Sequence, residues 1–536
     1  MMAAFTTLDW VVIAAYFLLL VGLVVWSTRR RQNSSADYFL AGRHLGWFVV
    51  GASIFASNVG SEHIVGLAGT GARSGVVFGH FELHSWLILL LGWVFVPIYM
   101  RARVFTMPEF LEQRYSPWAR WFLSLITLVG YVLTKVSVTV YAGGVVFEAL
   151  MGIDFWVGAV AIVVLTGVYT VIGGLRAVVY TESLQAIVLI VGSATVTLMG
   201  LWEVGGWTAL CESVGEDRLQ MFLPHDHPDY PWTGMVIAAP IIGLWYWCTD
   251  QNIVQRVLAA RDETQARRGT IFAGYLKLLP FFIFLVPGLI AYSLARDGRL
   301  ELAETDQAFP MLVRTLLPPG VRGLVAGGLL AALMSSLAAV FNSCSTLFTI
   351  DVYRKLRPQA SEAKLVQVGR VATGVVVVAG ILWIPLMRNI SDQLFHYLNS
   401  VQAYLAPPIA AVFFLGLFWK RVNSAGAMTV LVGGFLVGMT RLLAELNSDS
   451  LSGWPLAFAE INFLHFCSLL FLASVVTLVT VSLLTARPDY EQLDGLTYGT
   501  TAAVDREASR ATWNRSDVVH SLVIVAVIIG VFAYFS

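Results

Sequence analysis

Apolar runs near 20 residues long recur along the whole chain, and short polar or basic segments separate them. A helix of about 20 apolar residues crosses the hydrocarbon core of a bilayer and satisfies its own backbone polar groups, as lipid requires. The pattern therefore predicts an all-α integral membrane protein with about 14 transmembrane helices. The expected spans cover residues 8–27, 45–72, 76–99, 118–151, 155–172, 181–202, 232–255, 271–294, 320–350, 366–387, 394–419, 427–446, 463–484 and 518–535.

Basic residues at the ends of these spans predict their orientation. Arg29 follows the first span at once, Arg101 follows the third, and Lys420 follows the span that ends near residue 419. Lys and Arg accumulate in cytoplasmic loops, so we place these loops inside. An even number of spans then puts both termini outside, in a multi-pass protein of the plasma or inner membrane.

The spans fall into two matching sets. Five spans within residues 45–202 correspond to five within residues 232–419, and the two sets enter the membrane from opposite sides. Inverted repeats of this kind occur in secondary transporters, which place their ligands between broken helices near the membrane midplane. We expect one transmembrane domain over residues 1–536, in which an extra helix at 8–27 and helices within 427–536 flank the two repeats.

The composition agrees with a membrane protein. Hydrophobic residues make up 57% of the 536 residues, charged residues only 13%, and the formal net charge is zero, whereas soluble proteins carry about a quarter charged residues. A neutral chain gives no indication of a nucleic-acid partner. The four scattered cysteines predict neither a disulfide framework nor a metal site. The first 27 residues lack a basic leading region and a cleavage site, which favours a retained helix.

The second span contains a polar interruption. The run from Ser57 through Asn58, Gly60 and Glu62 to His63 is small, polar and unfavourable for a helix. At membrane depth such a run is tolerated only where it is buried in protein or lines a wet cavity, and unwound backbone carbonyls suit a cation such as sodium. Close helix packing would explain the glycines alone, but the polar side chains together favour function because they are costly in a membrane.

Two charged residues interrupt other spans. Glu82 lies in the third span and Lys277 in the run GYLKLLPF. A charge inside a membrane requires a partner or water, so both are site candidates, although each is near enough to a helix end to lie at the interface. If the two side chains meet, they neutralise each other and leave hydrogen-bonding capacity for a neutral, hydroxyl-rich ligand.

Three further segments carry candidate contacts. Tyr246 and Trp247 belong to the aromatic run LWYWCTDQ, which suits a sugar face or an interfacial belt. Ala332, Ser335 and Ser336 share one helix face, where the hydroxyls either bind a cation or bond to their own helix. Asn399 and Gln402 lie one turn apart and either bind a polar ligand or join two helices.

Several longer motifs together resemble the sodium/glucose cotransporters of the sodium:solute symporter family. The motifs are DYFLAGR (37–43), GASIFASNVGSEHIVGLAGTGA (51–72), GWVFVPIY (92–99), TMPEFL (106–111), LWYWCTDQ (244–251), GYLKLLP (274–280), SSLAAVFNSCSTLFTIDVY (335–353) and PPIAAVFFLGLFWKRVN (407–423). The resemblance covers nearly the whole chain. It implies a LeuT-type core of two inverted five-helix repeats that operates by alternating access.

The resemblance also implies roles for individual residues. It assigns sodium (Na+) to the carbonyls of Ala56, Val59 and Ala332 and the hydroxyls of Ser335 and Ser336. It assigns the sugar to Asn58, His63, Glu82, Ser85, Tyr246, Trp247, Lys277, Asn399 and Gln402. The expected gates are Phe78, Phe81 and Phe395 outside and Tyr246 inside, and Glu182 matches an acidic residue near the ion exit path.

Several positions depart from the family pattern. Asn399 stands where glucose-type members have glutamine, Gln402 where they have threonine, and Gly243 where they have a polar side chain. Ala338 and Ala339 replace hydroxyls that two-sodium members use for a second ion. The sequence therefore predicts one sodium ion per substrate and leaves the identity of the sugar open.

The leading expectation is a sodium-coupled symporter that imports a neutral monosaccharide of the glucose or galactose type, and not an enzyme. Another polyol, such as myo-inositol, mannose or fructose, is the nearest alternative. A carboxylate substrate is disfavoured because no arginine falls among the expected cavity positions. A transporter-like sugar sensor or a sodium-gated channel is the alternative of a different class.

Overall fold

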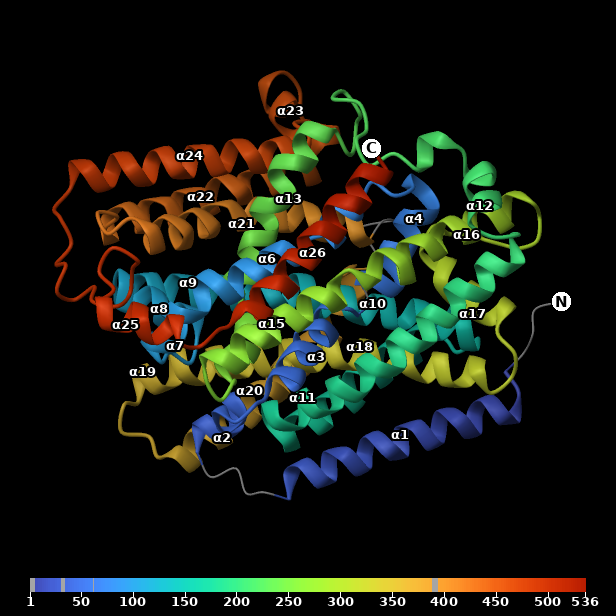
Figure 1. The fold of residues 1–536 in the computed structure, drawn as a ribbon, viewed down its shortest axis with the longest axis horizontal. Helices are drawn as coiled ribbons and strands as arrows, with labels where there is room; N and C mark the ends of the chain where they lie inside the picture. The colour runs from blue at the N-terminus through green and yellow to red at the C-terminus, as the bar shows by residue number, and fades with distance from the viewer. Residues whose placement is uncertain (1–4, 30–33, 61, 388–393) are drawn as a thin grey trace.

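The computed structural model describes residues 5–29, 34–60, 62–387 and 394–536, which form helices with no named strand among them. Most of the long helices run side by side along the long axis of the molecule (Figure 1). In chain order the α-helices are α1 (Thr7–Thr28), α2 (Ser35–Leu40), α3 (Trp47–Asn58), α4 (Ala68–Ser74), α5 (Gly79–Glu82), α6 (Ser85–Leu90), α7 (Val96–Ala102), α8 (Met107–Arg114), α9 (Pro117–Tyr131), α10 (Ser137–Val146), α11 (Phe155–Glu203), α12 (Trp207–Val214), α13 (Trp232–Cys248), α14 (Gln251–Leu258), α15 (Glu263–Lys277), α16 (Val286–Arg296), α17 (Ala308–Leu316), α18 (Val321–Thr346), α19 (Arg354–Leu356), α20 (Glu362–Met387), α21 (Leu394–Phe418), α22 (Ser424–Leu446), α23 (Trp454–Ala459), α24 (Phe463–Leu484), α25 (Ala503–Arg510) and α26 (Arg515–Tyr534).

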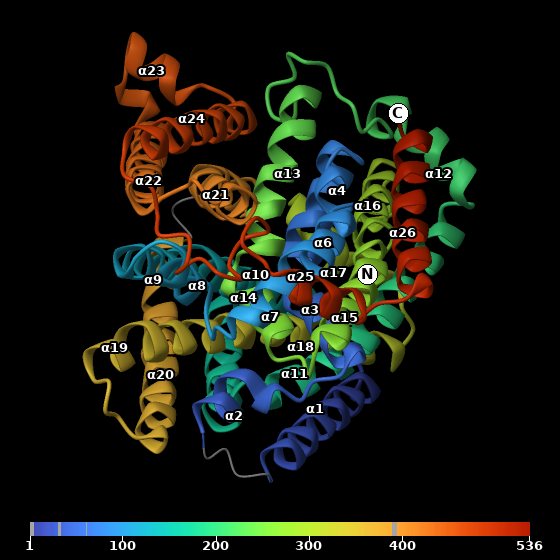
Figure 2. The ribbon, with the colours of Figure 1, turned by 60° about the vertical axis from the view of Figure 1, so that its left-hand side comes forward.

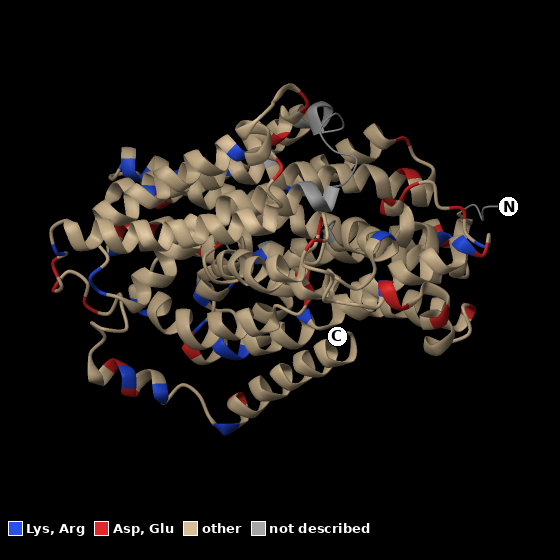
Figure 3. Cartoon of the chain, turned by 90° about the horizontal axis from the view of Figure 1, so that it is seen from above, with Lys and Arg blue, Asp and Glu red and all other residues tan. Residues whose placement is uncertain are grey.

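The helices are long and apolar enough for a polytopic membrane protein. Within the described residues, 11 helices meet the length and hydropathy of a membrane span, or up to 13 when each of two bent helix pairs counts as one span. Short π-helical turns join several of the helical pieces, including η4 (Val132–Val136) between α9 and α10. Lys, Arg, Asp and Glu are sparse along the middles of the long helices and more frequent toward their ends (Figure 3). The all-α membrane fold predicted from the hydropathy pattern is therefore confirmed.

The polar interruption of the second span is a real break between helices. α3 ends at Asn58, the chain turns by 59°, and helix resumes through the π-helical segment η2 (Glu62–Leu67) into α4. Val59 adopts an extended backbone conformation, with φ −84° and ψ 97°. An extended residue frees backbone groups from the i to i−4 ladder of the helix, so this break offers them to a neighbouring element.

A second bend lies between α13 and α14, which meet at 44°. The Asp250 side chain caps α14 by accepting a 2.7 Å hydrogen bond from the Asn252 amide. The cap provides an acceptor for one of the four backbone donors that a helix N-terminus leaves unpaired. This bend places Tyr246 and Trp247 at the end of α13, beside the break after α3.

The helix α11 runs from Phe155 to Glu203 but contains a non-helical residue at Gly174, with φ 54° and ψ −161°. A side chain there would be strained by the positive φ, and its Cβ would lie 2.8 Å from the Tyr38 carbonyl oxygen. The sequence predicts helices 155–172 and 181–202 with a turn at Arg176. The structure moves the turn to Gly174 and extends helix through residues 175–180, because glycine alone fits against the Tyr38 backbone.

The helix α18 lies at the centre of the molecule. Its most apolar window is 94% buried, whereas the corresponding windows of α1 and α26 are 22% and 17% buried. Figure 2 shows α1 and α26 along the periphery, with α21, α22 and α24 grouped on the opposite side of α13. α18 therefore presents its small polar face, which includes Ser335 and Ser336, to protein and not to lipid.

Candidate substrate and sodium site

A cavity, here called the central cavity, lies where the break after α3 faces α5, α13, α15 and α21. It holds about 450 Å³ of space, its mouth included. Most of the predicted substrate residues line it, together with residues that the sequence did not assign. The lining residues are Asn58, His63, Phe81, Glu82, His84, Ile242, Gly243, Tyr246, Trp247, Lys277, Leu398, Asn399 and Gln402.

A buried ion pair forms one wall of the central cavity. Lys277 Nζ donates to Glu82 Oε2 at 2.7 Å and to Asn58 Oδ1 at 3.1 Å. His63 Nε2 lies 3.2 Å from the same Glu82 oxygen. The side chains of Glu82 and Lys277 are only 3% and 5% exposed, so the interfacial interpretation of these two charges is wrong. Each charge is neutralised by its partner, and the amide of Asn58 links the pair to the helix break.

This ion pair has consequences for stability and for ligand chemistry. Removal of one partner from a buried pair leaves an uncompensated charge and costs about 3–5 kcal/mol. The intact pair has no net charge but still presents charged donor and acceptor atoms, whose hydrogen bonds are stronger than neutral ones. The wall therefore suits an uncharged ligand that carries several hydroxyl groups.

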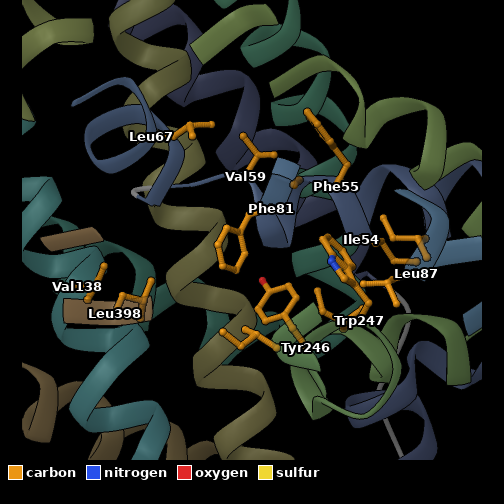
Figure 4. Packing of buried hydrophobic residues seen from close by; sticks show 14 of the residues in the cluster. Ile54, Phe55, Val59, Leu67, Phe81, Leu87, Val138, Tyr246, Trp247 and Leu398 are labelled. Atoms are coloured by element: carbon orange, nitrogen blue, oxygen red, sulfur yellow. The ribbon is translucent and has the colours of Figure 1, made fainter. Parts of the chain in front are cut away.

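Two aromatic side chains from the end of α13 form the facing wall. Asn58 Nδ2 donates to the Tyr246 hydroxyl at 3.1 Å, and Lys277 Nζ lies 5.5 Å from the centroid of the Trp247 ring. Figure 4 shows Phe81, Tyr246 and Trp247 around a common space, with Leu398 of α21 on the other side. Asn58 therefore joins both walls of the central cavity through its two amide atoms.

The predicted outer gate lies in two layers. Phe81 lines the central cavity, and Phe78 stacks on it with ring centroids 5.1 Å apart. Tyr230, from the loop before α13, packs edge-on against Phe78 at 5.1 Å and is 5% exposed. The sequence analysis did not identify Tyr230, because a tyrosine in a polar loop gives no signal of what it covers. Phe395 belongs to α21, but its side chain lies outside the described part of the structure, as does that of Glu62.

His84 is a lining residue that the sequence analysis missed. It is 4% exposed, and its Nε2 atom has no hydrogen-bond partner among the described residues. A Cβ at Gly243 would lie 2.7 Å from His84 Nδ1 and would overlap Leu87. Gly243 is therefore the residue that makes room for His84. Ser85 is buried beside it but does not line the cavity.

Four of the five predicted sodium ligands, Ala56, Ala332, Ser335 and Ser336, come together between the break and α18. Ser335 Oγ donates to the Ala56 carbonyl at 3.1 Å and to the Ala332 carbonyl at 2.8 Å. Ser336 Oγ donates to the Ala332 carbonyl at 3.3 Å. A Cβ at Gly60 would overlap Ser336 Oγ, which shows how closely the two elements approach. Both serines thus bond to their own helix, as the alternative interpretation expected, and one also reaches across to α3.

These atoms have the chemistry that a hard cation requires. Sodium is bound by neutral and anionic oxygens, as other hard cations are, and this cluster consists of carbonyl and hydroxyl oxygens from two helices. The carbonyls of Ala56 and Ala332 and the two serine hydroxyls supply such oxygens here, and the carbonyl of Val59 stays a prediction. Ala332, Ser335 and Val59 are at most 1% exposed and Ser336 is 8% exposed.

Residues 38–434 match the sodium:solute symporter family. The chain belongs to this family. It is 40% identical over 88% of its length to sodium/glucose cotransporter 1 of Oryctolagus cuniculus, covering 78% of that protein. It is 39% identical to sodium/myo-inositol cotransporter 2 of Homo sapiens, over 92% of this chain and 79% of that one. It is also 39% identical to a sodium/mannose cotransporter of Bos taurus, over 99% and 97% of the two chains.

Solved structures share the fold of this symporter. A Na+-coupled sialic acid symporter in a substrate-bound outward-open state superimposes with a TM-score of 0.75 at 21% identity, over 90% of this chain and 99% of that one. The nucleobase-cation symporter Mhp1 gives a TM-score of 0.50 at 13% identity, over 92% and 99%. The family resemblance and sodium as the coupling ion, both predicted from the sequence, are confirmed. The relatives are transporters by name, in agreement with the expectation that the chain is not an enzyme.

Glu182 of the symporter lies away from the central cavity, in the second part of α11. Its Oε1 atom pairs with Arg256 Nη2 at 2.9 Å, and Ser53 Oγ donates to its Oε2 atom. Both charged side chains are fully buried. Ser53 lies one turn before Ser57 on α3, so Glu182 is connected to the helix that leads to the sodium ligands.

Proposed function

We propose that this symporter imports a neutral monosaccharide of the glucose or galactose type together with one sodium ion, by alternating access. The observation that carries the proposal is the position of the break after α3. Asn58 at the break contributes to the central cavity, while the carbonyl of Ala56, two residues earlier, accepts a hydrogen bond from Ser335 of α18. One short segment therefore belongs to both ligand sites.

In this proposal the sugar hydroxyls replace bonds that the cavity residues now make with one another. Asn58, His63, Glu82 and Lys277 supply donors and acceptors, and Trp247 supplies an apolar face. Asn399 and Gln402 approach from α21. His84 adds a ring nitrogen where Gly243 lacks a polar side chain, while Ser85 supports the wall from behind.

In this proposal the helix break couples sodium binding to sugar binding. Sodium bound by Ala56, Val59, Ala332, Ser335 and Ser336 fixes the break against α18, and that position completes the sugar wall at Asn58. Each ligand then raises the affinity of the other by the same factor, because binding free energies are linked. A membrane potential adds about 2.3 kcal/mol per charge for each 100 mV.

Alternating access requires one gate to open while the other stays closed. Phe78, Phe81 and Phe395 form the outer gate of the proposal, with Tyr230 as its cover, and Tyr246 forms the inner gate. Glu182, joined to α3 through Ser53, lies near the path by which sodium leaves.

The proposed scaffold is a single domain of 14 spans with both termini outside. Its ten central spans, within residues 45–202 and 232–419, form two inverted repeats of five, flanked by α1 and by the helices within 427–536. Two bent pairs that each count as one span, and the break of α11 at Gly174, support this count.

The proposed ratio of one sodium ion per sugar rests on two alanines of α18. Ala338 and Ala339 follow the serine pair and are fully buried, so neither supplies a side-chain oxygen for a second ion. A charge-to-sugar flux ratio of one is the expected result in proteoliposomes, and a ratio of two contradicts this part of the proposal.

A related polyol is the second candidate substrate. Asn399 and Gln402 depart from the glucose-type pattern, and both line the central cavity. Relatives of similar identity are named for myo-inositol and for mannose. Competition between labelled glucose and unlabelled polyols decides between the two candidates.

The test is uptake of labelled glucose into proteoliposomes under an inward sodium gradient. The proposal predicts accumulation above the external concentration, and loss of accumulation when choline replaces sodium. Competition by unlabelled galactose, myo-inositol, mannose and fructose ranks the substrates. Uptake that is indifferent to sodium contradicts the proposal, and solute-evoked current without accumulation favours the sensor or channel instead.

A further inference from the structure

His84 lies on a turn that interrupts the third membrane span. α5 ends at Glu82 and α6 begins at Ser85, and Leu83 and His84 between them have ψ values of 20° and 11°. In a regular helix, side chains two positions apart point roughly 200° away from each other. Here the side chains of Glu82 and His84 both line the central cavity. The turn therefore brings His84 to the same space as the buried ion pair.

The ring of His84 occupies the place of a side chain at position 243. A Cβ built on Gly243 of α13 would lie 2.7 Å from His84 Nδ1 and 2.8 Å from His84 Cε1. A real Cβ cannot approach other atoms so closely, so any residue other than glycine would displace the ring. The space next to α13 is therefore filled by an imidazole that comes from the turn between α5 and α6.

The imidazole of His84 has unused hydrogen-bonding capacity. Its Nε2 atom has no hydrogen-bond partner among the described residues, although the residue is only 4% exposed. An unpaired buried polar atom is costly, and in a folded protein such an atom indicates a partner that is a water, an ion or a ligand. His63, the other histidine of the cavity lining, contacts Glu82 through its own Nε2. The ring of His84 is thus available to a solute in the cavity.

Packing holds this ring in one orientation. The ring of Phe81 lies 5.5 Å from it, centroid to centroid, with the two planes at 61°. Gly243 lies against its Nδ1 edge. A side chain that is already ordered loses little conformational entropy when a ligand binds, so His84 is prepared for one hydrogen bond to a solute.

We propose that His84 is a specificity-determining residue, which recognises one hydroxyl group of the solute in place of the side chain that Gly243 lacks. A neutral imidazole donates from one ring nitrogen and accepts at the other, and a hydroxyl group can pair with either. A site built to bond to a hydroxyl rejects the analogue that lacks it, because the polar group of the site is then left unpaired. This inference rests on the proposed function, since it takes its ligand class from there.

The experiment measures sodium-driven uptake of labelled glucose into proteoliposomes in competition with glucose and with its monodeoxy analogues, each of which lacks a different hydroxyl group. His84→Leu removes the unpaired nitrogen but keeps an apolar side chain, so the variant is expected to fold. It should weaken competition by glucose about tenfold, and competition by one analogue hardly at all. That analogue lacks the hydroxyl that His84 recognises. His225→Leu is the control, because His225 is an exposed histidine of the loop before α13.

A reciprocal exchange tests whether the two positions share one place. In the double variant His84→Ala, Gly243→Ser, the ring is gone and only the flexible end of Leu87 has to move away from the new Cβ. The serine hydroxyl should restore discrimination against the same analogue that His84→Leu no longer rejects. Discrimination at a different hydroxyl, or none, would show that the residues do not share one place and would overturn the inference.

The outcomes separate this inference from the function on which it rests. If His84→Leu weakens competition by glucose and by every analogue equally, or leaves them all unchanged, the inference is overturned and the symporter proposal stays intact. Absence of sodium-dependent glucose uptake by the wild type overturns the proposed substrate, and this inference with it.

Discussion

Glu82 and Lys277 form a buried ion pair beside the central cavity. Either charge alone would be expensive inside a membrane, and together they form a neutral wall rich in donors and acceptors. Lys277 also donates to Asn58, and Glu82 also contacts His63. The proposed specificity of the central cavity for an uncharged solute therefore depends on the pair and not on either residue alone.

Replacement of Glu82 by Gln tests the pair. The change keeps the shape of the side chain but leaves Lys277 buried without its anion, at a cost of about 3–5 kcal/mol. We expect sodium-driven glucose uptake to fall by more than about a hundredfold and the Tm of the purified protein to fall. Asp505→Asn is the control, because the Asp505 side chain is 44% exposed and lies 3.8 Å from Arg101, where an ion pair contributes little. Normal uptake by Glu82→Gln would contradict the assignment.

Replacement of Ser336 by Ala tests the ion site. Loss of one oxygen ligand should raise the sodium concentration for half-maximal uptake by roughly tenfold, equivalent to about 1.4 kcal/mol. Ser474→Ala is the matched control, since Ser474 also bonds to its own helix, through the Leu470 carbonyl, but belongs to α24. An unchanged sodium dependence in Ser336→Ala would remove this serine from the site.

Sequence reasoning predicted most of the residues that line the central cavity, but it missed His84 and the cover of the cavity, Tyr230. Polar side chains in apolar runs, such as Asn58 and Lys277, are conspicuous because a membrane makes them costly. His84 was missed because a histidine near a helix end has no such signal, and its importance depends on the space left by Gly243. Tyr230 was missed because its contact with Phe78 joins segments that the sequence separates widely.

The helix break after α3 is the element that connects the two proposed sites. The sequence predicted it from the run of small polar residues, and the structure places an extended Val59 and a 59° bend there. The predicted turn in α11, at Arg176, lies two residues after the observed one at Gly174. The prediction relied on Arg176 because basic residues indicate an inside loop. The turn lies at Gly174 because only glycine has the backbone freedom that the contact with Tyr38 requires.

Replacement of Gly60 by Ala tests the close approach of the break to α18. The added methyl group would overlap Ser336 Oγ, and overpacking of this kind costs about 1–3 kcal/mol. We expect weaker binding of sodium and of sugar together, because the same segment serves both. Gly374→Ala is the control, since its Cβ meets nothing within 4 Å. A loss confined to one ligand would separate the two sites.

The short helical segment η8 (Thr305–Gln307) packs against α4, the second part of the broken helix. Asp306 Oδ1 lies 2.6 Å from the position of a Cβ at Gly69 of α4. Burial, assisted by Glu304 and opposed by Arg73, raises the pKa of Asp306 to about 7. In the folded protein this carboxyl therefore keeps its proton at pH values where the unfolded chain has lost it.

The sign of the pH dependence follows from that difference. Between the ordinary pKa of 3.8 and about 7, the folded state binds more protons than the unfolded state, so the contribution of Asp306 to stability decreases as pH rises. We expect Tm to fall between about pH 5 and pH 8, and the fall to be smaller in Asp306→Asn. Identical pH profiles of Tm for the two proteins would show that Asp306 is not the responsible group.

At the scale of the whole molecule, the proposed function requires that the sodium site and the sugar site are coupled, so that binding of one ligand favours binding of the other. The sequence alone predicted the membrane fold, the family and the coupling ion, because hydropathy and long motifs are properties of the chain. It predicted a cavity at the polar break but not the complete lining of that cavity, because the lining depends on how α5, α13, α15 and α21 pack.

Calorimetric titration of the purified chain tests the central claim most directly, because it measures both ligands at equilibrium. The account predicts that saturating sodium lowers the Kd for glucose by at least about tenfold, and that saturating glucose lowers the Kd for sodium by the same factor. A glucose Kd that is the same with sodium and with choline would contradict the claim that the break after α3 joins the two sites.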